Sequence, residues 1–219
     1  MTKRKQYRHI MFILLIVLWC ILFFRQYIQK ALILVQVNNS LILNYENIST
    51  WTGWLIVQQA RKQIGIVNSY DSSYYQDWYP PVDRGACTDV IIDTLEWLWY
   101  PFKKKIDSDI LVHKNIYGIV NPDPNIDFRR VRIVKIFLEQ YAESLSINTQ
   151  NFNHRQAGDI VTFDQIPGGL WHIGIVSSKR ADDGRPLLIH NYGFWTTEDD
   201  MLMKRPAKIS WHYRVINLL

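Results

Sequence analysis

The hydrophobic pattern of this chain changes once along its length, after His154, and that change limits the folds open to it. Before it, apolar residues recur at helical spacing; after it come short runs rich in β-branched residues, separated by Gly, Pro and Asp turns. Helices followed by antiparallel strands form the α+β pattern, so we expect an α+β domain. The predicted strands cover residues 158–164, 171–178, 186–192 and 211–217.

Capping and stop residues divide the first part of the chain into helices. Ser49 or Thr50 can cap a helix that runs to about Ile64, where Gly65 stops it. The loop at 121–130 is stiffened by two prolines. The other expected helices run from Cys87 to before Pro101, over residues 107–117, and over residues 131–143.

An uninterrupted apolar run covers residues 10–24 and follows four basic residues. Extended to residue 28 as a helix, it spans about 28 Å, close to the ~30 Å hydrocarbon core of a bilayer. The residues after it are too bulky for a good signal-cleavage site, which favours an uncleaved anchor over a secreted protein. We therefore divide the chain into a basic tail with a signal-anchor transmembrane helix (1–30), a connecting segment with the first helix (31–57), and a working domain (58–219).

The positive charge of the chain is concentrated in this tail. The whole sequence carries a formal net charge of +5, but residues 1–30 hold six basic groups and no acidic one. The rest of the chain has 19 basic and 20 acidic groups, so a nucleic-acid-binding domain is not expected. The positive-inside rule then predicts a single-pass protein of the inner (cytoplasmic) membrane, with its C-terminal domain in the periplasm or cell exterior.

Two cysteines, Cys20 in the apolar run and Cys87 in the domain, exclude an internal disulfide framework. Cys87 begins a predicted helix, where the positive end of the helix dipole is expected to lower the pKa of its thiol. The alternative is that Cys87 is a small buried hydrophobic residue, which is the commoner role of a lone cysteine.

A nucleophilic cysteine needs an imidazole as base, and that imidazole needs an orienting group. His172 and His190 lie on consecutive predicted strands, so they are candidates for cross-strand neighbours in which one ring holds the other. We interpret the remaining histidines of the domain as surface or packing residues: His113, His154 and His212.

Metal and cofactor sites are not predicted. The close ligand spacings of zinc sites are absent, although Cys87, His172, His190 and an aspartate can in principle converge in space. Phosphate-binding and dinucleotide-binding glycine motifs are also missing.

Six segments occur in a distinctive order: ARKQIGIVNSYD (60–71), GACTDVIIDTL (85–95), NPDPNIDFRRV (121–131), GDIVTF (158–163), HIGIVSS (172–178) and GRPLLIHNYG (184–193). With these segments the chain resembles the YijF-like family of uncharacterised bacterial envelope proteins, over about residues 58–216.

The order of motifs is also similar to that of the NlpC-type cell-wall cysteine peptidases. This likeness implies a papain-like fold, with N-terminal helices packed on a small antiparallel sheet or half-barrel. It implies that Cys87 is the nucleophile, His172 the base and His190 the orienting residue, with Asn191 as its substitute. It also places Tyr70 where a tyrosine assists in binding the oxyanion. The departure is at the nucleophile, which reads A-C-T-D here instead of D-C-S-G.

A further set of residues is assigned to substrate binding. Asp89, which has no counterpart in the peptidases, belongs to it, as do aromatic residues of the loop before the nucleophile. Two arginines can bind a carboxylate of the substrate, or they can brace their own loop by pairing with Asp123 and Asp127. The aromatic and basic members are Tyr74, Tyr75, Trp78, Tyr79, Arg129 and Arg130.

The sequence therefore predicts a membrane-anchored, extracytoplasmic thiol hydrolase that acts without a cofactor. The resemblance implies peptide or amide bonds of peptidoglycan as its substrate, and residues 10–28 as its contact with the inner membrane. Two alternatives stay open. One is an inert binding or scaffolding module of the same fold, and the other is a cysteine-dependent acyl or peptidyl transferase.

Overall fold

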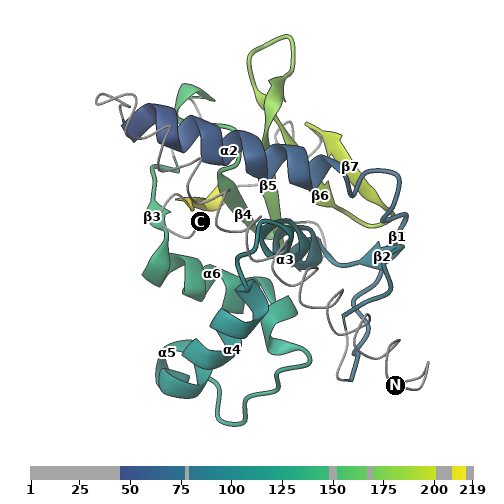
Figure 1. The fold of residues 1–219 in the computed structure, drawn as a ribbon, viewed down its shortest axis with the longest axis vertical. Coiled ribbons are helices and arrows are strands. Elements are labelled where there is room, and N and C mark those ends of the chain that lie inside the picture. The colour runs from purple at the N-terminus through teal and green to yellow at the C-terminus, as the bar shows by residue number, and fades with distance from the viewer. Residues whose placement is uncertain (1–44, 77–78, 148–151, 167–169, 201–208, 216–219) are drawn as a thin grey trace, which may run out of the picture. The chain divides into compact units, whose positions relative to one another are not determined.

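The computed structural model describes residues 45–76, 79–147, 152–166, 170–200 and 209–215. Within them the chain has the expected α+β order, with most helices before the main sheet (Figure 1). No helix in these ranges is long and apolar enough to cross a bilayer. The segment 10–28, predicted to be the membrane anchor, lies outside the described residues.

The helices differ from expectation mainly in the stretch that follows Trp97. The helix predicted at 107–117 begins earlier, because Pro101 precedes the first helical residue and its fixed φ suits a helix start. It also breaks at His113, whose φ of −118° is not helical, and resumes for one short turn. The α-helices are α2 (Tyr45–Arg61), α3 (Cys87–Trp97), α4 (Phe102–Val112), α5 (Lys114–Tyr117) and α6 (Val131–Tyr141); 3-10 turns cover Asp127–Arg129 and Phe152–His154.

A six-stranded sheet, with every neighbouring pair antiparallel, forms the second half in the order β3-β8-β4-β5-β6-β7. All four predicted strands are present, whereas β3 and β7 are too short to show alternation in the sequence. A separate parallel pair, β1 (Ser69–Tyr70) and β2 (Arg84–Gly85), precedes α3. The main strands are β3 (Glu143–Ser144), β4 (Ile160–Ile166), β5 (Leu170–Arg180), β6 (Pro186–Asn191), β7 (Thr196–Asp199) and β8 (Ile209–Arg214).

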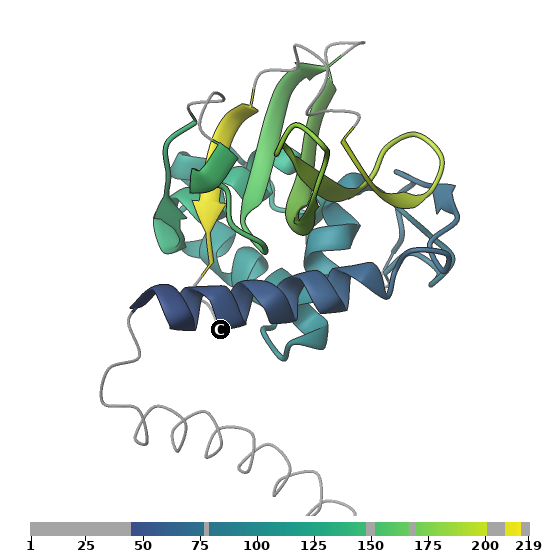
Figure 2. The ribbon, with the colours of Figure 1, turned by 90° about the horizontal axis from the view of Figure 1, so that it is seen from above.

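The two faces of the sheet bury two different apolar clusters. Ile173, Ile175 and Ile189 belong to the larger cluster, which includes the buried faces of α2, α3, α4 and α6. Val176 and Leu188, which alternate with them along β5 and β6, belong to the smaller cluster on the other face. Figure 2 shows the middle helices on one side of the strands. The face of β5 on which a side chain lies therefore decides whether it meets α3.

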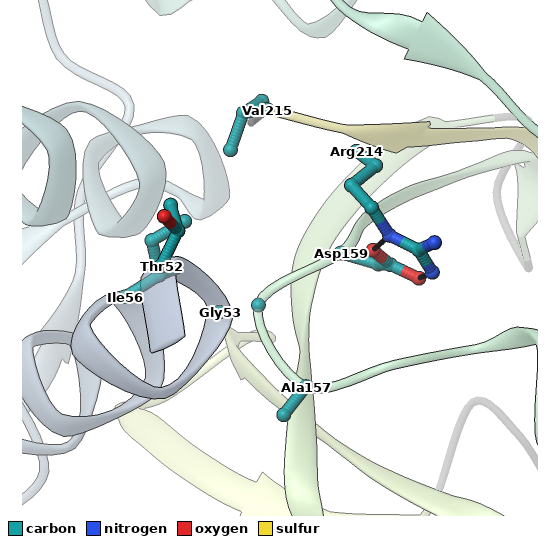
Figure 3. Close-up of a pocket in the computed structure, with 8 residues that line it drawn as sticks. Thr52, Gly53, Ile56, Ala157, Asp159, Arg214 and Val215 are labelled. Carbon is teal, nitrogen blue, oxygen red and sulfur yellow. Dashed lines mark hydrogen bonds and ion pairs between the residues drawn. The ribbon is translucent and has the colours of Figure 1, made fainter. Parts of the chain in front are cut away.

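Helix α2 is fitted closely against the turn before β4. A Cβ atom built on Gly53 would lie 1.9 Å from the carbonyl oxygen of Ala157, and one built on Gly158 would lie 2.4 Å from the Cα of Gly53. Figure 3 shows Gly53 facing this turn, with the ion pair of Asp159 and Arg214 beside it. The cavity between them measures only about 10 Å³, room for about one water molecule.

Candidate functional site

Cys87 is the first residue of α3 and is buried, with 4% of its surface exposed. Its thiol lies against the backbone N–H of Ile173 in β5, and the N–H groups of Thr88 and of Cys87 itself also face the sulfur. The fold thus places the thiol beside the strand residue that directly follows His172.

The pKa of the Cys87 thiol is raised, whereas the sequence analysis predicted that it would be lowered. Burial raises it to about 12, and the negative charge of Asp89 adds to this effect. The surrounding N–H groups act in the other direction but are outweighed. The prediction that the helix dipole lowers the pKa of this thiol was therefore wrong. Burial destabilises the thiolate more than the helix dipole stabilises it.

His172 and His190 form the expected contact across neighbouring strands. Nε2 of His172 lies 2.8 Å from Nδ1 of His190, and both rings are buried. On the far side, Nε2 of His190 lies 3.4 Å from Oδ1 of Asp199 in β7. These three side chains form a row, His172–His190–Asp199, that crosses β5, β6 and β7.

The His172 ring occupies an apolar environment. The rings of Phe163 and Tyr192 lie 6.4 Å and 5.3 Å from it, and alternation along β5 turns it to the face opposite Ile173. Burial, and then the charge of His190, lower the pKa of His172 well below its usual value, against the opposing effect of Asp199. The Cys87 thiol lies against the backbone N–H of Ile173 on the α3 side of the sheet, so the thiol and the His172 ring face opposite sides of β5, and the described residues include no hydrogen bond between them.

The two hydrogen bonds of the row are both formed when the ring hydrogens of His190 and His172 are placed as follows. A carboxylate only accepts hydrogen bonds, so Nε2 of His190 carries the hydrogen that faces Asp199. In a neutral His190, Nδ1 is then an acceptor, and Nε2 of His172 must donate to it. A neutral His172 consequently keeps an unprotonated Nδ1, which is the form that a general base requires.

Asn191 and Tyr70 both lie beside the residues that lead into Cys87. Nδ2 of Asn191 donates to the carbonyl of Gly85 at 2.7 Å, while its Oδ1 is buried without a hydrogen-bond partner among the described residues. Tyr70 is paired with Gly85 through β1 and β2. Burial, followed by the charges of Cys87 and Asp89, raises the pKa of Tyr70 to about 12, so its hydroxyl stays protonated near the thiol.

Asp89 and Arg129 form a buried ion pair, which favours a structural role over the substrate binding predicted for them. Oδ2 of Asp89 accepts a hydrogen bond from the backbone N–H of Ala86 at 2.6 Å and lies 2.8 Å from Nη2 of Arg129. Arg129 also donates to the carbonyls of Asp71 and Ser73. Four of its five N–H groups are thus bonded within the chain and its side chain is buried, which favours a structural role over binding a substrate carboxylate.

The other residues predicted to bind substrate contact acidic residues of the loops. Nη1 of Arg130 lies 2.9 Å from Oδ1 of Asp127, so this arginine braces its own loop. The hydroxyl of Tyr75 donates to Asp71 at 2.5 Å. The hydroxyl of Tyr74, which is exposed, donates to Asp123 at 3.3 Å. Trp78 lies outside the described residues.

Two features of the site escaped sequence reasoning. Asp199 lies in the short strand β7, and nothing in its local sequence indicates a histidine partner. The role of Asp89 had a weak signal, because an acidic residue three positions after a helix cap often accepts the N–H of the cap residue. In the ranges that the structure covers, no three His, Cys, Asp or Glu side chains are grouped as a metal site requires.

Comparison with known proteins agrees with the first resemblance. Residues 57–215 match the model of a family described as "Domain of unknown function (DUF1287)". The chain is also 36% identical over 177 residues to "Uncharacterized protein YijF" of Escherichia coli (strain K12), an alignment that covers 74% of this chain and 82% of that protein. The resemblance to the YijF-like family is confirmed.

Proposed function

The chain belongs to the DUF1287 family, and from the surroundings of Cys87 we propose that it is a thiol hydrolase of papain-like architecture. It cleaves peptide or amide bonds of peptidoglycan, anchored in the inner membrane by residues 10–28 with its domain outside. The observation that carries the proposal is the hydrogen-bonded row His172–His190–Asp199. Its first member, His172, directly precedes Ile173, whose backbone N–H contacts the Cys87 thiol.

The row supplies a base in the correct form. The proton transfer requires a rearrangement at the start of β5 that brings Nδ1 of His172 from the opposite face of the sheet to the thiol. Nδ1 then takes the thiol proton, and His190 and Asp199 stabilise the resulting positive charge. His190 and Asp199 act as positioning residues, because they reach the thiol only through His172.

The first step joins the Cys87 sulfur to the carbonyl carbon of the substrate as the thiol proton passes to His172. Backbone N–H groups at the start of α3, with the hydroxyl of Tyr70, donate to the oxygen that becomes negative; one such donor contributes about 3 kcal/mol to stabilising the transition state. Collapse expels the amine, which receives the proton from His172. Water then attacks the thioester, and proton return through His172 restores the thiol and releases a carboxylic acid.

The raised pKa of Cys87 gives this mechanism a neutral resting state. Both the thiol and the imidazole are buried, and the pKa of each is shifted toward its uncharged form. The proton therefore moves during attack on the substrate instead of beforehand, and unproductive oxidation of a standing thiolate is avoided.

The proposal is tested on purified sacculi. The full chain in detergent micelles is expected to release soluble peptide fragments, and Cys87→Ala is expected to reduce the rate by at least about 10³-fold. Cys20→Ala is the matched control, since it removes the other cysteine and should leave the rate unchanged. Equal release by wild type and Cys87→Ala would overturn the proposal.

The inert binding module remains the second candidate, because Cys87 is buried and its pKa is raised. It predicts that Cys87→Ala retains binding to sacculi and that no fragment is released by any variant. A transferase, the third candidate, predicts instead that an added amine such as glycinamide becomes joined to the released fragments.

A further inference from the structure

A groove of about 500 Å³ lies at the opposite end of α3 from Cys87. This volume falls within the range of small-molecule sites. Its lining combines two aromatic rings with two basic and two acidic side chains. The residues that line it are Tyr79, Glu96, Trp99, Pro101, Lys103, Lys104 and Asp107.

Trp99 holds an unusual position in this lining. Trp99 is the residue directly after the C-cap of α3. Its N–H donates to the carbonyl of Glu96, and the N–H of Tyr100 donates to the carbonyl of Leu95. Glycine normally fills this place, because φ is positive there. Among the described residues, Trp99 is the one non-glycine with positive φ, at 66°, a conformation that costs about 1–2 kcal/mol.

Packing does not compensate for this cost, since 78% of the Trp99 surface is exposed. A large apolar ring kept at an unfavourable backbone position and left open to solvent indicates a binding role. The ring supplies an apolar platform with a polar edge.

Most charged groups around the groove are already occupied. Nζ of Lys103 pairs with Asp107 at 2.6 Å, and Glu96 accepts hydrogen bonds from the hydroxyl of Tyr79 and from the backbone N–H of Lys103. Lys104 has no ion-pair partner among the residues that the structure describes. Oδ2 of Asp107 is used by Lys103, whereas its Oδ1 is buried without a hydrogen-bond partner among the described residues. The groove therefore offers an open indole face, an available ammonium group and one carboxylate oxygen that can accept a hydrogen bond from a sugar hydroxyl.

We propose that this groove binds a saccharide that carries a carboxylate. One face of a sugar ring presents C–H groups that can stack on the Trp99 indole, and the carboxylate can pair with Lys104. The choice of a cell-wall sugar rests on the proposed function. The groove then holds the glycan part of the substrate at one end of α3, while the thiol works at the other.

Saturation-transfer NMR on the full chain in detergent micelles tests this site with two probes, N-acetylmuramic acid and N-acetylglucosamine, which lacks the carboxylate. We expect transfer to the sugar-ring protons and tighter binding of the acid. Trp99→Gly should weaken binding about tenfold, or about 1.4 kcal/mol, while the thermal midpoint stays equal or rises. Lys104→Gln should abolish the preference for the acid.

Trp97→Ala is the matched control, because Trp97 is also exposed, ends the same helix and does not line the groove. Unchanged binding by Trp99→Gly, an equal loss in Trp97→Ala, or no binding by the wild type would overturn the inference. Cys87→Ala should bind both sugars as the wild type does. The saccharide site and the thiol hydrolase activity are therefore tested independently, and either proposal can be overturned without the other.

Discussion

Nη2 of Arg129 lies 2.8 Å from Oδ2 of Asp89, and both side chains are almost completely buried. The same carboxylate accepts the N–H of Ala86, so this ion pair fixes the first turn of α3. The guanidinium also binds two backbone carbonyls of the loop that follows β1. The helix start that presents Cys87 is therefore positioned by a charge pair that joins two loops.

Removing one partner of this pair leaves a buried charge without compensation. Asp89→Ala is expected to lower the free energy of unfolding by about 3–5 kcal/mol, measured by urea denaturation. Asp83→Ala is the control, since Asp83 pairs with Arg84 at the surface and its loss should change stability little. A similar, small effect of both substitutions would show that the Asp89 pair does not hold the helix start.

Gly65 and Gly158 have nearly equal positive φ but different surroundings, so substituting each one distinguishes the effect of backbone strain from that of close packing. Gly65 has a φ of 82° and nothing within 4 Å of a built Cβ, whereas Gly158 has a φ of 87° and meets the backbone of Gly53. Gly65→Ala should cost about 1–2 kcal/mol of stability, and Gly158→Ala should cost about 1–3 kcal/mol more. Equal thermal shifts for the two variants would contradict the close contact of α2 with this turn.

Stability at acidic pH should depend on Glu198. Burial opposes its ionisation, but hydrogen bonds from Arg61, Lys179 and Ser177 outweigh it and lower the pKa from 4.5 to about 2. A lowered carboxyl pKa stabilises the fold above the unfolded value, and this contribution is lost as pH falls from about 4.5 toward 2.

Glu198→Gln should therefore lower the thermal midpoint at neutral pH and converge with the wild type near pH 2. The measurement is the thermal midpoint against pH. Asp182→Asn, which alters an exposed carboxylate, is the control and should follow the wild-type curve. Parallel curves for Glu198→Gln and wild type would contradict the assignment.

Much of the fold could be predicted from periodicity, because amphipathic helices and long strands repeat their pattern over several turns or residues. The short strand β7 could not, since it depends on pairing with β6. The start of α4 at Phe102 had a signal in Pro101, which we interpreted only as the end of the preceding helix. Strands of two to four residues carry too little alternation to be seen.

The candidate site was predictable only in part. The neighbouring strands suggested the His172–His190 contact, but the third member, Asp199, depends on the register of β6 and β7. The pKa of Cys87 depends on the competition between burial and the helix dipole, and the sequence shows only the dipole. The same limit applies to Arg129, whose partner is 40 residues away.

The most direct test of the proposed function is the rate of Cys87 alkylation by iodoacetamide against pH, with modification at Cys87 mapped by mass spectrometry to exclude Cys20. The full chain is compared with His172→Gln, which can still donate to His190 but cannot take a proton. His113→Gln is the control, because His113 pairs with Asp109 away from the thiol.

If His172 is the base, the wild-type rate stays nearly constant between about pH 6 and pH 9, since the low pKa of His172 keeps its Nδ1 available throughout. His172→Gln should then be at least about tenfold slower at neutral pH, with a rate that rises about tenfold per pH unit as the thiolate forms. The account is contradicted if wild type and His172→Gln show the same rate and the same slope.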